Sequence, residues 1–327
     1  MTDRRHIQET SQFTYEEMKT SLIFTLLFLS LLLQAQDELT RNDNILNPWI
    51  VNPAIAGSGT NSLNFQAGRQ WFGIHNSPYY AAFHIDGRLA PFDFYKPDMR
   101  LNKTMYKSAG RIGLGAAFMT DRSGPFSFSE FKLIYSYHLP LNNNQLSFGL
   151  SNDIEIYGVN ENYLNPLEVY DPAIQGLSRG KVLYNPGVGI YYYGKLFSTG
   201  MSVNNIFENN VLLKNDYIAY SEISRVFTLQ GNYKFELPQE VDIEPGVMIG
   251  TSDFIDYIFD ISGTAVYKEN YMLKITYRSL NILFFHIGLD FNRYGITYGY
   301  NTSLSSINRY NSGSHEIAFS IKFGYLY

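Results

Sequence analysis

The chain has 327 residues, a formal net charge of −5 and no cysteine. Without thiols it has no disulfides, no cysteine metal sites and no lipidated cysteine anchor. It holds 27 tyrosines and 24 phenylalanines, yet only 17% of its residues are charged. This composition is too aromatic for a disordered chain and too polar for a bundle of membrane helices. The mild acidity and the lack of a basic run argue against a nucleic-acid-binding protein.

The first part of the chain is typical of an export signal. After Met18 comes the apolar run SLIFTLLFLSLLL, which is too short to cross a bilayer comfortably as a helix. The run predicts a signal peptide that begins at Met18 and is cleaved near Ala35. A signal anchor with a cytoplasmic stub is the alternative. We therefore expect a signal-peptide region at 1–35, an extended Asn-Pro-rich segment at 36–60 and a separate domain at 61–327.

Beyond residue 60 the dominant sequence period is two. In FHIGLDF, the apolar residues Phe285, Ile287 and Leu289 alternate with His286 and Gly288. Alternation over about ten residues, with turn residues between the segments, predicts half-exposed strands. The sequence contains about fourteen such segments and no convincing helical periodicity. They start near residues 62, 79, 110, 127, 144, 182, 196, 222, 239, 255, 271, 281, 294 and 314.

These strands fit either a soluble sandwich or barrel, or a barrel that spans a membrane. A soluble β-protein packs its large side chains inward and shows a charged outer face. Here the face opposite the large side chains holds mostly Gly, Ser, Thr, Asn and Ala, as the lumen of a membrane barrel does. We therefore predict an all-β fold, a transmembrane antiparallel up-and-down β-barrel of about fourteen strands in the outer membrane.

The last strand carries a long apolar stripe. In SHEIAFSIKFGYLY the stripe consists of Ile317, Phe319, Ile321, Phe323, Tyr325 and Tyr327. We expect it to face lipid, with the two tyrosines near an interface. An aromatic closing strand is also a plausible insertion signal for outer-membrane assembly.

The connections between the strands differ in length. Residues 139–145 and 236–240 are short turns, whereas residues 90–108, 159–181 and 206–221 are long connections. Outer-membrane barrels keep short turns in the periplasm and long loops outside the cell. The long connections are therefore expected on the extracellular side.

The segment 37–60 differs from the rest of the chain. It has two Asn-Pro steps, which favour turns and extended backbone, and it is too apolar to hang in water. We expect it to pack in the lumen or against one mouth of the barrel.

Gly113-Leu114-Gly115 and Gly187-Val188-Gly189 lack the strand–turn–helix context of a nucleotide site. Their glycines indicate strand curvature or close packing of this segment.

Few residues have the arrangement that catalysis or metal binding requires. The six histidines are scattered, with no pair at metal spacing beside a third ligand. Ser136 and His138 share a strand face. They are either the serine and histidine of a hydrolase site, or a serine beside a histidine that merely lines the lumen. We predict no enzyme, no cofactor and no metal.

Several charged residues fall on the small-residue face of their strands. They indicate either a hydrated lumen whose charges pair with one another, or side chains that bind the N-terminal segment or a partner peptide. These residues are Asp153, Glu155, Lys274, Arg278, Asp290 and Lys322.

Five stretches in order resemble the PorP/SprF family of type IX secretion system outer-membrane proteins of Bacteroidetes. They are Asn52-Pro53-Ala54-Ile55-Ala56-Gly57, Arg69-Gln70-Trp71-Phe72-Gly73, RIGLGAAFMTDRSGP (111–125), YNPGVGIYYYGKLFSTGMSVNNI (184–206) and SHEIAFSIKF (314–323). Isoleucine replaces the usual aromatic residue in the first stretch, and Asn301-Thr302 follows Gly299-Tyr300 where the family often has Tyr-Asp. The matching motif residues, structural or partner-binding, are Asn52, Pro53, Gly57, Arg69, Trp71, Gly73, Asn185, Pro186, Gly187, His315 and Glu316.

The resemblance implies a non-enzymatic barrel of the gliding-motility type that supports secretion or cell-surface attachment of cargo proteins through their C-terminal domains. It also implies contact with periplasmic or lipoprotein components of the machinery and with outer-membrane lipid, and no nucleic-acid partner. Loops on a rigid scaffold usually carry recognition, so residues 159–181 and 90–108 are the expected cargo sites. A passive porin or small-solute transporter is the alternative function.

Overall fold

The computed structural model describes residues 46–89, 111–160, 181–208, 210–211, 221–252, 254 and 256–323. The chain divides into two compact units, residues 1–40 and residues 41–327, and every described residue belongs to the second. The predicted signal peptide, the predicted loops over most of their length and the terminal tyrosines Tyr325 and Tyr327 lie outside the described residues.

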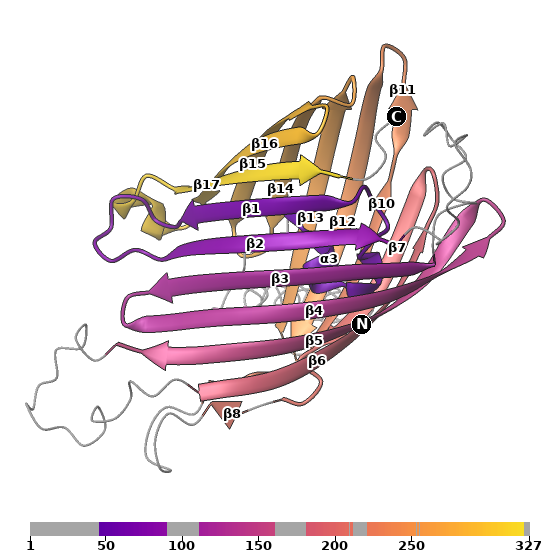
Figure 1. Cartoon of the computed structure of the whole chain (residues 1–327). Helices are drawn as coiled ribbons and strands as arrows, with labels where there is room; N and C mark the ends of the chain where they lie inside the picture. Colours follow the sequence, from indigo (N-terminus) through magenta and orange to yellow (C-terminus); the bar gives the residue numbers. More distant parts are fainter. Residues whose placement is uncertain are drawn as a thin grey trace, which may run out of the picture. The chain divides into compact units, whose positions relative to one another are not determined.

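Antiparallel strands pair in sequence order around a closed barrel (Figure 1). β1 pairs with β17, and β10 pairs with β12, so that the sheet has no free edge along its main course. β10 and β11 pair in succession with β12 and together form one barrel strand, which makes fourteen. The bounds are β1 (Ser62–Arg69), β2 (Tyr79–Arg88), β3 (Ile112–Ser123), β4 (Phe126–Leu141), β5 (Asn144–Val159), β6 (Lys181–Tyr193), β7 (Phe197–Asn204), β10 (Val226–Tyr233), β11 (Phe235–Leu237), β12 (Val241–Ser252), β13 (Asp256–Tyr267), β14 (Tyr271–Arg278), β15 (Ile282–Phe291), β16 (Tyr294–Ser303) and β17 (Ser314–Lys322).

The predicted fold class and strand number are confirmed. The largest error in a predicted strand start is at β10, which begins at Val226 rather than near residue 222. The short strands β8 (Asn210–Val211) and β9 (Ser221–Glu222) form a separate two-stranded ribbon.

Among the described residues, no helix is both long enough and apolar enough to cross a membrane. In the described ranges, the helical elements are one short α-helix, α3 (Pro48–Val51), and the 3-10 helices η2 (Pro53–Ile55) and η4 (Ser306–Tyr310).

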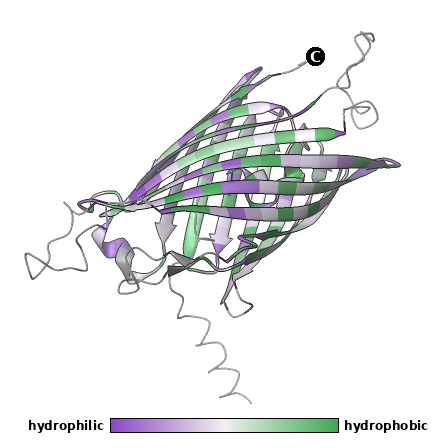
Figure 2. Ribbon diagram, turned by 60° about the horizontal axis from the view of Figure 1, so that its bottom comes forward, coloured by the Kyte–Doolittle hydropathy of each residue, from purple (hydrophilic) through white to green (hydrophobic). Residues whose placement is uncertain are grey.

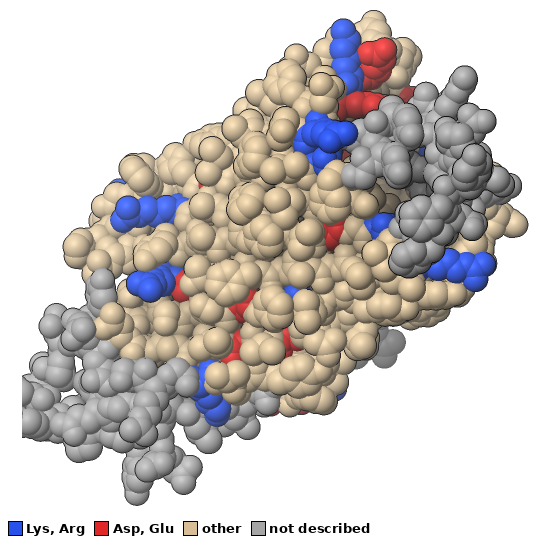
Figure 3. Space-filling view, viewed as in Figure 1, with Lys and Arg blue, Asp and Glu red and all other residues tan. Residues whose placement is uncertain are grey.

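Side chains alternate between a large apolar outer face and a small polar inner face. On β4, Leu133 and Tyr135 of the outer face are 47% and 43% exposed, whereas Ser136 of the inner face is fully buried. Figure 2 shows this alternation of hydropathy along the strands, and in Figure 3 most of the outer face carries no charge. A wall whose outward residues are this apolar and aromatic is suited to lipid acyl chains.

The two ends of the barrel carry different connections. We call the end where β1 begins and β17 ends the terminus end, and the opposite end the loop end. Five of the six strand connections at the terminus end span only two or three residues: 142–143, 194–196, 238–240, 268–270 and 292–293. The connections 70–78, 160–180, 205–225 and 304–313 are at the loop end. By the usual asymmetry of outer-membrane barrels, the terminus end faces the periplasm.

This topology corrects one prediction about the loops. Residues 90–108 and 159–181 are not on the same side, because β2 and β3 are joined at the terminus end and β5 and β6 at the loop end. Strands alternate in direction, so the connection after the second strand returns to the side on which the first strand began. The connection 89–111 is therefore the one long connection on the periplasmic side.

Candidate functional site in the barrel lumen

The two Asn-Pro steps fold the start of the described chain into two short turns. Pro48 opens α3 and Pro53 opens η2, positions where a missing N–H costs nothing. Asn52 lies between them and caps η2, because its Oδ1 accepts a hydrogen bond from the Ala54 nitrogen at 3.0 Å. We call residues 46–57 the lumen segment.

The wall formed by β4, β5 and β7 holds the lumen segment mainly through the segment's backbone carbonyls. The donors are buried or half-buried side chains of the inner face, and they leave few carbonyls of the segment unpaired. The bonds are Lys132 Nζ to Ile50 O (3.3 Å), Ser202 Oγ to Val51 O (2.8 Å), Asn204 Nδ2 to Val51 O (2.7 Å), Ser147 Oγ to Ala54 O (2.6 Å) and Ser136 Oγ to Ala56 O (2.7 Å).

Asn52 makes the opposite kind of contact. It is fully buried, and its Nδ2 donates to the carbonyls of Ile190 on β6 (3.2 Å) and Met201 on β7 (3.3 Å). A buried carboxamide that satisfies both its oxygen and its nitrogen fixes the position of the segment against the wall.

Glycines in the wall make room for this approach. A Cβ atom at Gly149 would lie well under 3.0 Å from backbone atoms of Pro53 and Ala54. A Cβ at Gly189 would meet Asn52 Oδ1, and one at Gly113 would meet Ala56 O, again under 3.0 Å. Close packing of the N-terminal segment is therefore the reason for these glycines, in agreement with one of the two readings of the sequence.

Apolar contacts add to the polar ones. Trp49, Ile50 and Ile55 are each less than 9% exposed and pack with Ala117 and Ile134 of the wall. Burial of side chains of this size stabilises a fold by about 1.5–3 kcal/mol each. The segment is thus bound as a piece of core rather than as a loosely placed tail.

A chain of hydrogen bonds joins the lumen segment to the last strand. Asn47 Nδ2 donates to Gln66 Oε1 (3.0 Å), and Gln66 Nε2 donates to the Tyr80 hydroxyl (3.0 Å). Tyr80 donates to Glu316 Oε2 (2.5 Å), while Glu316 Oε1 pairs with His286 Nε2 (2.5 Å). The hydrogen bonds cross β1, β2, β17 and β15, and so connect the lumen segment with the last strand inside the barrel.

Ser136 and His138 do form a pair, with Oγ and Nε2 3.0 Å apart. Both also contact Ala56 O, and His138 Nδ1 bonds the Tyr193 hydroxyl at 2.9 Å. Ser136 is fully buried beneath the lumen segment, so its hydroxyl is not open to a substrate. The pair holds the segment. In the described part of the chain, no three His, Asp or Glu side chains are grouped to hold a metal ion.

The predicted site residues come together in three places. The first is the lumen segment itself, with Asn52, Pro53 and Gly57. Gly57 has a φ of 71°, its N–H donates to Asp86 Oδ2 (3.2 Å), and a Cβ there would be 2.9 Å from the Gly113 Cα. Only glycine fits this left-handed, crowded position.

The second place is at the loop end, where the Arg-Gln-Trp-Phe-Gly stretch meets the start of β17. Trp71 N donates to Ser314 Oγ (3.2 Å), and the Phe72 ring lies edge-on to His315 with centroids 5.4 Å apart. Arg69 Nε donates to Ser77 Oγ (2.9 Å), and Gly73 has a φ of 101°. These residues shape the rim and do not contact the lumen segment.

The third place is the loop-end half of β6. Asn185 is fully buried and donates to Glu155 Oε2 (3.1 Å), whereas Pro186 accepts a hydrogen bond from the Ile206 nitrogen (3.1 Å). A Cβ at Gly187 would crowd Asn204, which itself bonds Val51 O. Gly187 thus reaches the lumen segment through one intermediate residue.

Inward-facing charges are paired both within a strand and between strands. Lys132 contacts Glu130 (3.2 Å) and Asp153 (3.0 Å), and Lys322 contacts Asp290 (3.1 Å). The sequence interpretation missed Glu130, Lys132, Asp260 and His286. Lys132 could have been found, because it shares the alternation register of Ser136 and His138 in SEFKLIYSYHL.

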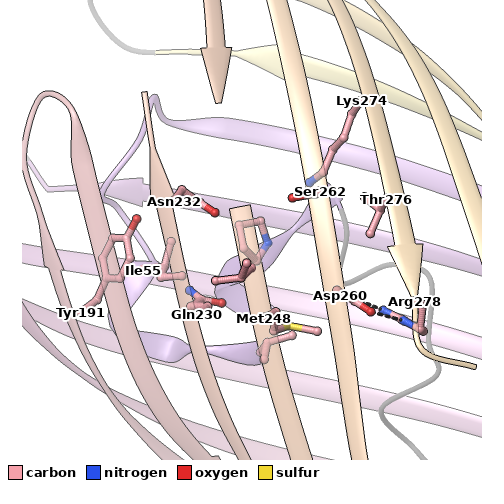
Figure 4. A pocket seen from close by; sticks show the side chains of 13 residues that line it. Ile55, Tyr191, Gln230, Asn232, Met248, Asp260, Ser262, Lys274, Thr276 and Arg278 are labelled. Carbon is pink, nitrogen blue, oxygen red and sulfur yellow. Dashed lines mark hydrogen bonds and ion pairs between the residues drawn. The ribbon is translucent and has the colours of Figure 1, made fainter. Parts of the chain in front are cut away.

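A cavity of about 120 Å³ remains between the lumen segment and the opposite wall of β10, β12, β13 and β14. Figure 4 shows Ile55 and Tyr191 on one side and Lys274, Thr276 and Arg278 on the other. Arg278 forms a two-pronged ion pair with Asp260, from Nε to Oδ1 (2.8 Å) and from Nη2 to Oδ2 (2.7 Å).

Comparison with known proteins identifies the family. A family model described as type IX secretion system membrane protein PorP/SprF matches residues 33–321. No curated protein matches the chain. Among solved structures, the outer-membrane protein Omp33 of Acinetobacter baumannii is 6% identical, with 81% of this chain and 99% of that chain covered and a TM-score of 0.48. The toluene transporter TodX of P. putida is 8% identical, with 84% and 93% covered and a TM-score of 0.48.

The family match covers nearly the whole chain, and the structure is the closed antiparallel barrel that the resemblance implied. Its location is the outer membrane. The chain belongs to the PorP/SprF family of type IX secretion system membrane proteins.

Proposed function

We propose that this barrel is a non-enzymatic scaffold of type IX secretion, of the gliding-motility type, that supports the secretion or surface attachment of cargo proteins through their C-terminal domains. The observation that carries the proposal, beside family membership, is the binding of the lumen segment by the inner wall. A lumen with a bound segment along one wall suits a rigid platform better than an open conduit.

The loop end is the cargo side in this proposal. It carries the connections 70–78, 160–180 and 304–313, and loops on a rigid scaffold usually carry recognition. Periplasmic or lipoprotein components would meet the terminus end, where the connection 89–111 is the longest target. This arrangement replaces the sequence-based expectation that residues 90–108 also bind cargo.

The test is affinity purification of the tagged protein from its own outer membrane, with two matched deletions. Removal of residues 163–178, at the loop end, is expected to abolish co-purification of cargo C-terminal domains and keep the periplasmic components. Removal of residues 93–107, at the terminus end, is expected to do the reverse. If no secreted C-terminal domain co-purifies and a deletion strain exports a normal surface proteome, the proposal fails.

The cavity beside the lumen segment favours one second candidate, a passive porin or small-solute transporter. This candidate requires ion conductance by the wild-type barrel in planar bilayers. Our proposal requires that the wild type conduct little and that a chain lacking residues 37–59 conduct more. High conductance by the wild type would support the porin.

A further inference from the structure

The lumen cavity has a polar wall of defined charge. Lys274 and Arg278 contribute two positive charges and Asp260 one negative charge, so the cavity wall carries a net charge of +1. The three side chains belong to neighbouring strands β13 and β14, where Asp260 is directly opposite Arg278 in the register.

Arg278 is held rigidly but is only partly satisfied. Its Nε and Nη2 are bound to Asp260, and its guanidinium carbon lies 5.2 Å from the centroid of the Phe284 ring. Nη1, which carries two further N–H groups, has no hydrogen-bond partner within the described part of the chain. Arg278 is 0% exposed, so its buried Nη1 N–H groups cost folding free energy unless an acceptor binds them.

Thr276 provides a second unpaired donor in the same wall. It is two residues from Arg278 on the same face of β14, about 7 Å away along the strand. It is 2% exposed, and its Oγ1 makes no hydrogen bond to any residue that the structure describes. Both residues line the cavity, as does Lys274, the next inward residue of β14 (Figure 4).

The lumen-segment side of the cavity is apolar, with Tyr191 beside it (Figure 4). Pro48, Val51 and Ile55 of the lumen segment face the cationic wall across the cavity. The cavity volume of about 120 Å³ is large enough for a small organic group. A ligand that satisfies both sides has one anionic, planar acceptor group and a short apolar body.

We propose that the cavity between the lumen segment and β14 binds an organic carboxylate, with the carboxylate on Arg278 Nη1 and Thr276 Oγ1 and the apolar part against Val51 and Ile55. Nη1 can donate a charge-assisted hydrogen bond to one carboxylate oxygen while the Thr276 hydroxyl donates to the other, and hydrogen bonds to charged groups are among the strong ones. The site is independent of the secretion role proposed above, since it involves the lumen and not the loop end.

The test uses the full-length mature barrel in lipid nanodiscs and isothermal titration with sodium butyrate. Butyrate is expected to bind, whereas butylamine and inorganic phosphate at equal ionic strength are not. Two further probes distinguish a free carboxylate from a peptide terminus, acetyl-Ala-Val-Leu with a free C-terminal carboxylate and the same peptide as its amide. Binding of butyrate or of the peptide with a free carboxylate, without binding of the peptide amide, supports the site. Which of the two binds shows whether the ligand is a free carboxylate or a peptide terminus.

Thr276→Val is the decisive variant, because it keeps the side-chain shape and removes a hydroxyl that bonds none of the residues the structure describes. Butyrate affinity is expected to fall about tenfold, which corresponds to about 1.4 kcal/mol. Thr297→Val, an inward-facing change on β16 outside the cavity lining, is the matched control and leaves affinity unchanged.

The double variant Asp260→Asn/Arg278→Met removes both partners of the ion pair and is expected to abolish binding. Asp290→Asn/Lys322→Met removes a more exposed inward-facing pair outside the cavity lining and is expected to leave binding unchanged. The proposal is overturned if neither carboxylate binds, if butylamine or phosphate binds as tightly as butyrate, or if Thr276→Val binds as tightly as wild type.

Discussion

The two walls of the lumen differ in the side chains that they present to the space between them. The wall of β3–β7 presents glycine and serine to the lumen segment, so that backbone meets backbone at Gly149 and serine hydroxyls reach the carbonyls of Ala54 and Ala56. The wall of β12–β15 presents Asp260, Lys274, Arg278 and Phe284 and leaves a cavity. The first wall contacts the lumen segment closely through glycine, serine and Lys132, whereas the long side chains of the second wall border the cavity.

The largest expected effect comes from closing the small-residue wall. Gly149→Val places side-chain atoms where the Pro53 and Ala54 backbone lies, and backbone cannot rotate away. We expect the lumen segment to leave the wall, with loss of at least about 3 kcal/mol of unfolding free energy and new protease cleavage within residues 46–57. Gly263→Val, where a Cβ meets no atom within 4 Å, is the control. Equal stability of the two variants would contradict the assigned packing.

The next effect tests the charged wall. Arg278→Met leaves the Asp260 carboxylate buried without its partner, which is expected to cost about 3–5 kcal/mol in chemical denaturation. Asp260→Asn/Arg278→Met removes both charges and is expected to recover most of that loss. If the double variant is no more stable than the single one, the ion pair is not the cause of the cost.

A smaller effect is expected where the two walls are connected. Glu316→Gln keeps the side-chain shape but removes the charge that accepts from Tyr80 and pairs with His286. The expected loss of unfolding free energy is about 1–2 kcal/mol. Glu269→Gln in the exposed 268–270 turn serves as the comparison and is expected to change nothing measurable.

The smallest effect is expected outside both walls. Lys195 and Glu236 form an ion pair at the terminus end with side chains 54% and 45% exposed. Lys195→Met is expected to change stability by less than about 1 kcal/mol, because solvent screens an exposed pair. A loss as large as that of Arg278→Met would show that burial does not govern these pairs.

Much of the barrel could be predicted from local sequence, for a simple physical reason. A strand between lipid and a packed lumen must alternate large apolar and small polar residues, so Ile317 and Phe319 identify both the strand and its outward face. The side of each connection also follows from strand count, and residues 90–108 would have been placed correctly by counting from the first strand.

The lumen site could be predicted only in part. The Asn-Pro steps indicated turns and the strand glycines indicated close packing, but nothing local pairs Asn52 with carbonyls 138 and 149 residues away. Asp260 and Arg278 are likewise joined by strand register. Such contacts depend on which strands become neighbours in space, which no single segment encodes.

The hydrogen-bond chain from Asn47 to His286 has a consequence for how the protein is made. Gln66 and Tyr80 are translated early, whereas the Glu316 carboxylate that they share belongs to the closing strand β17. Without β17 the Tyr80 hydroxyl would lose this acceptor, at a free-energy cost if it stayed buried. The lumen network is therefore complete only once the last strand has joined the barrel.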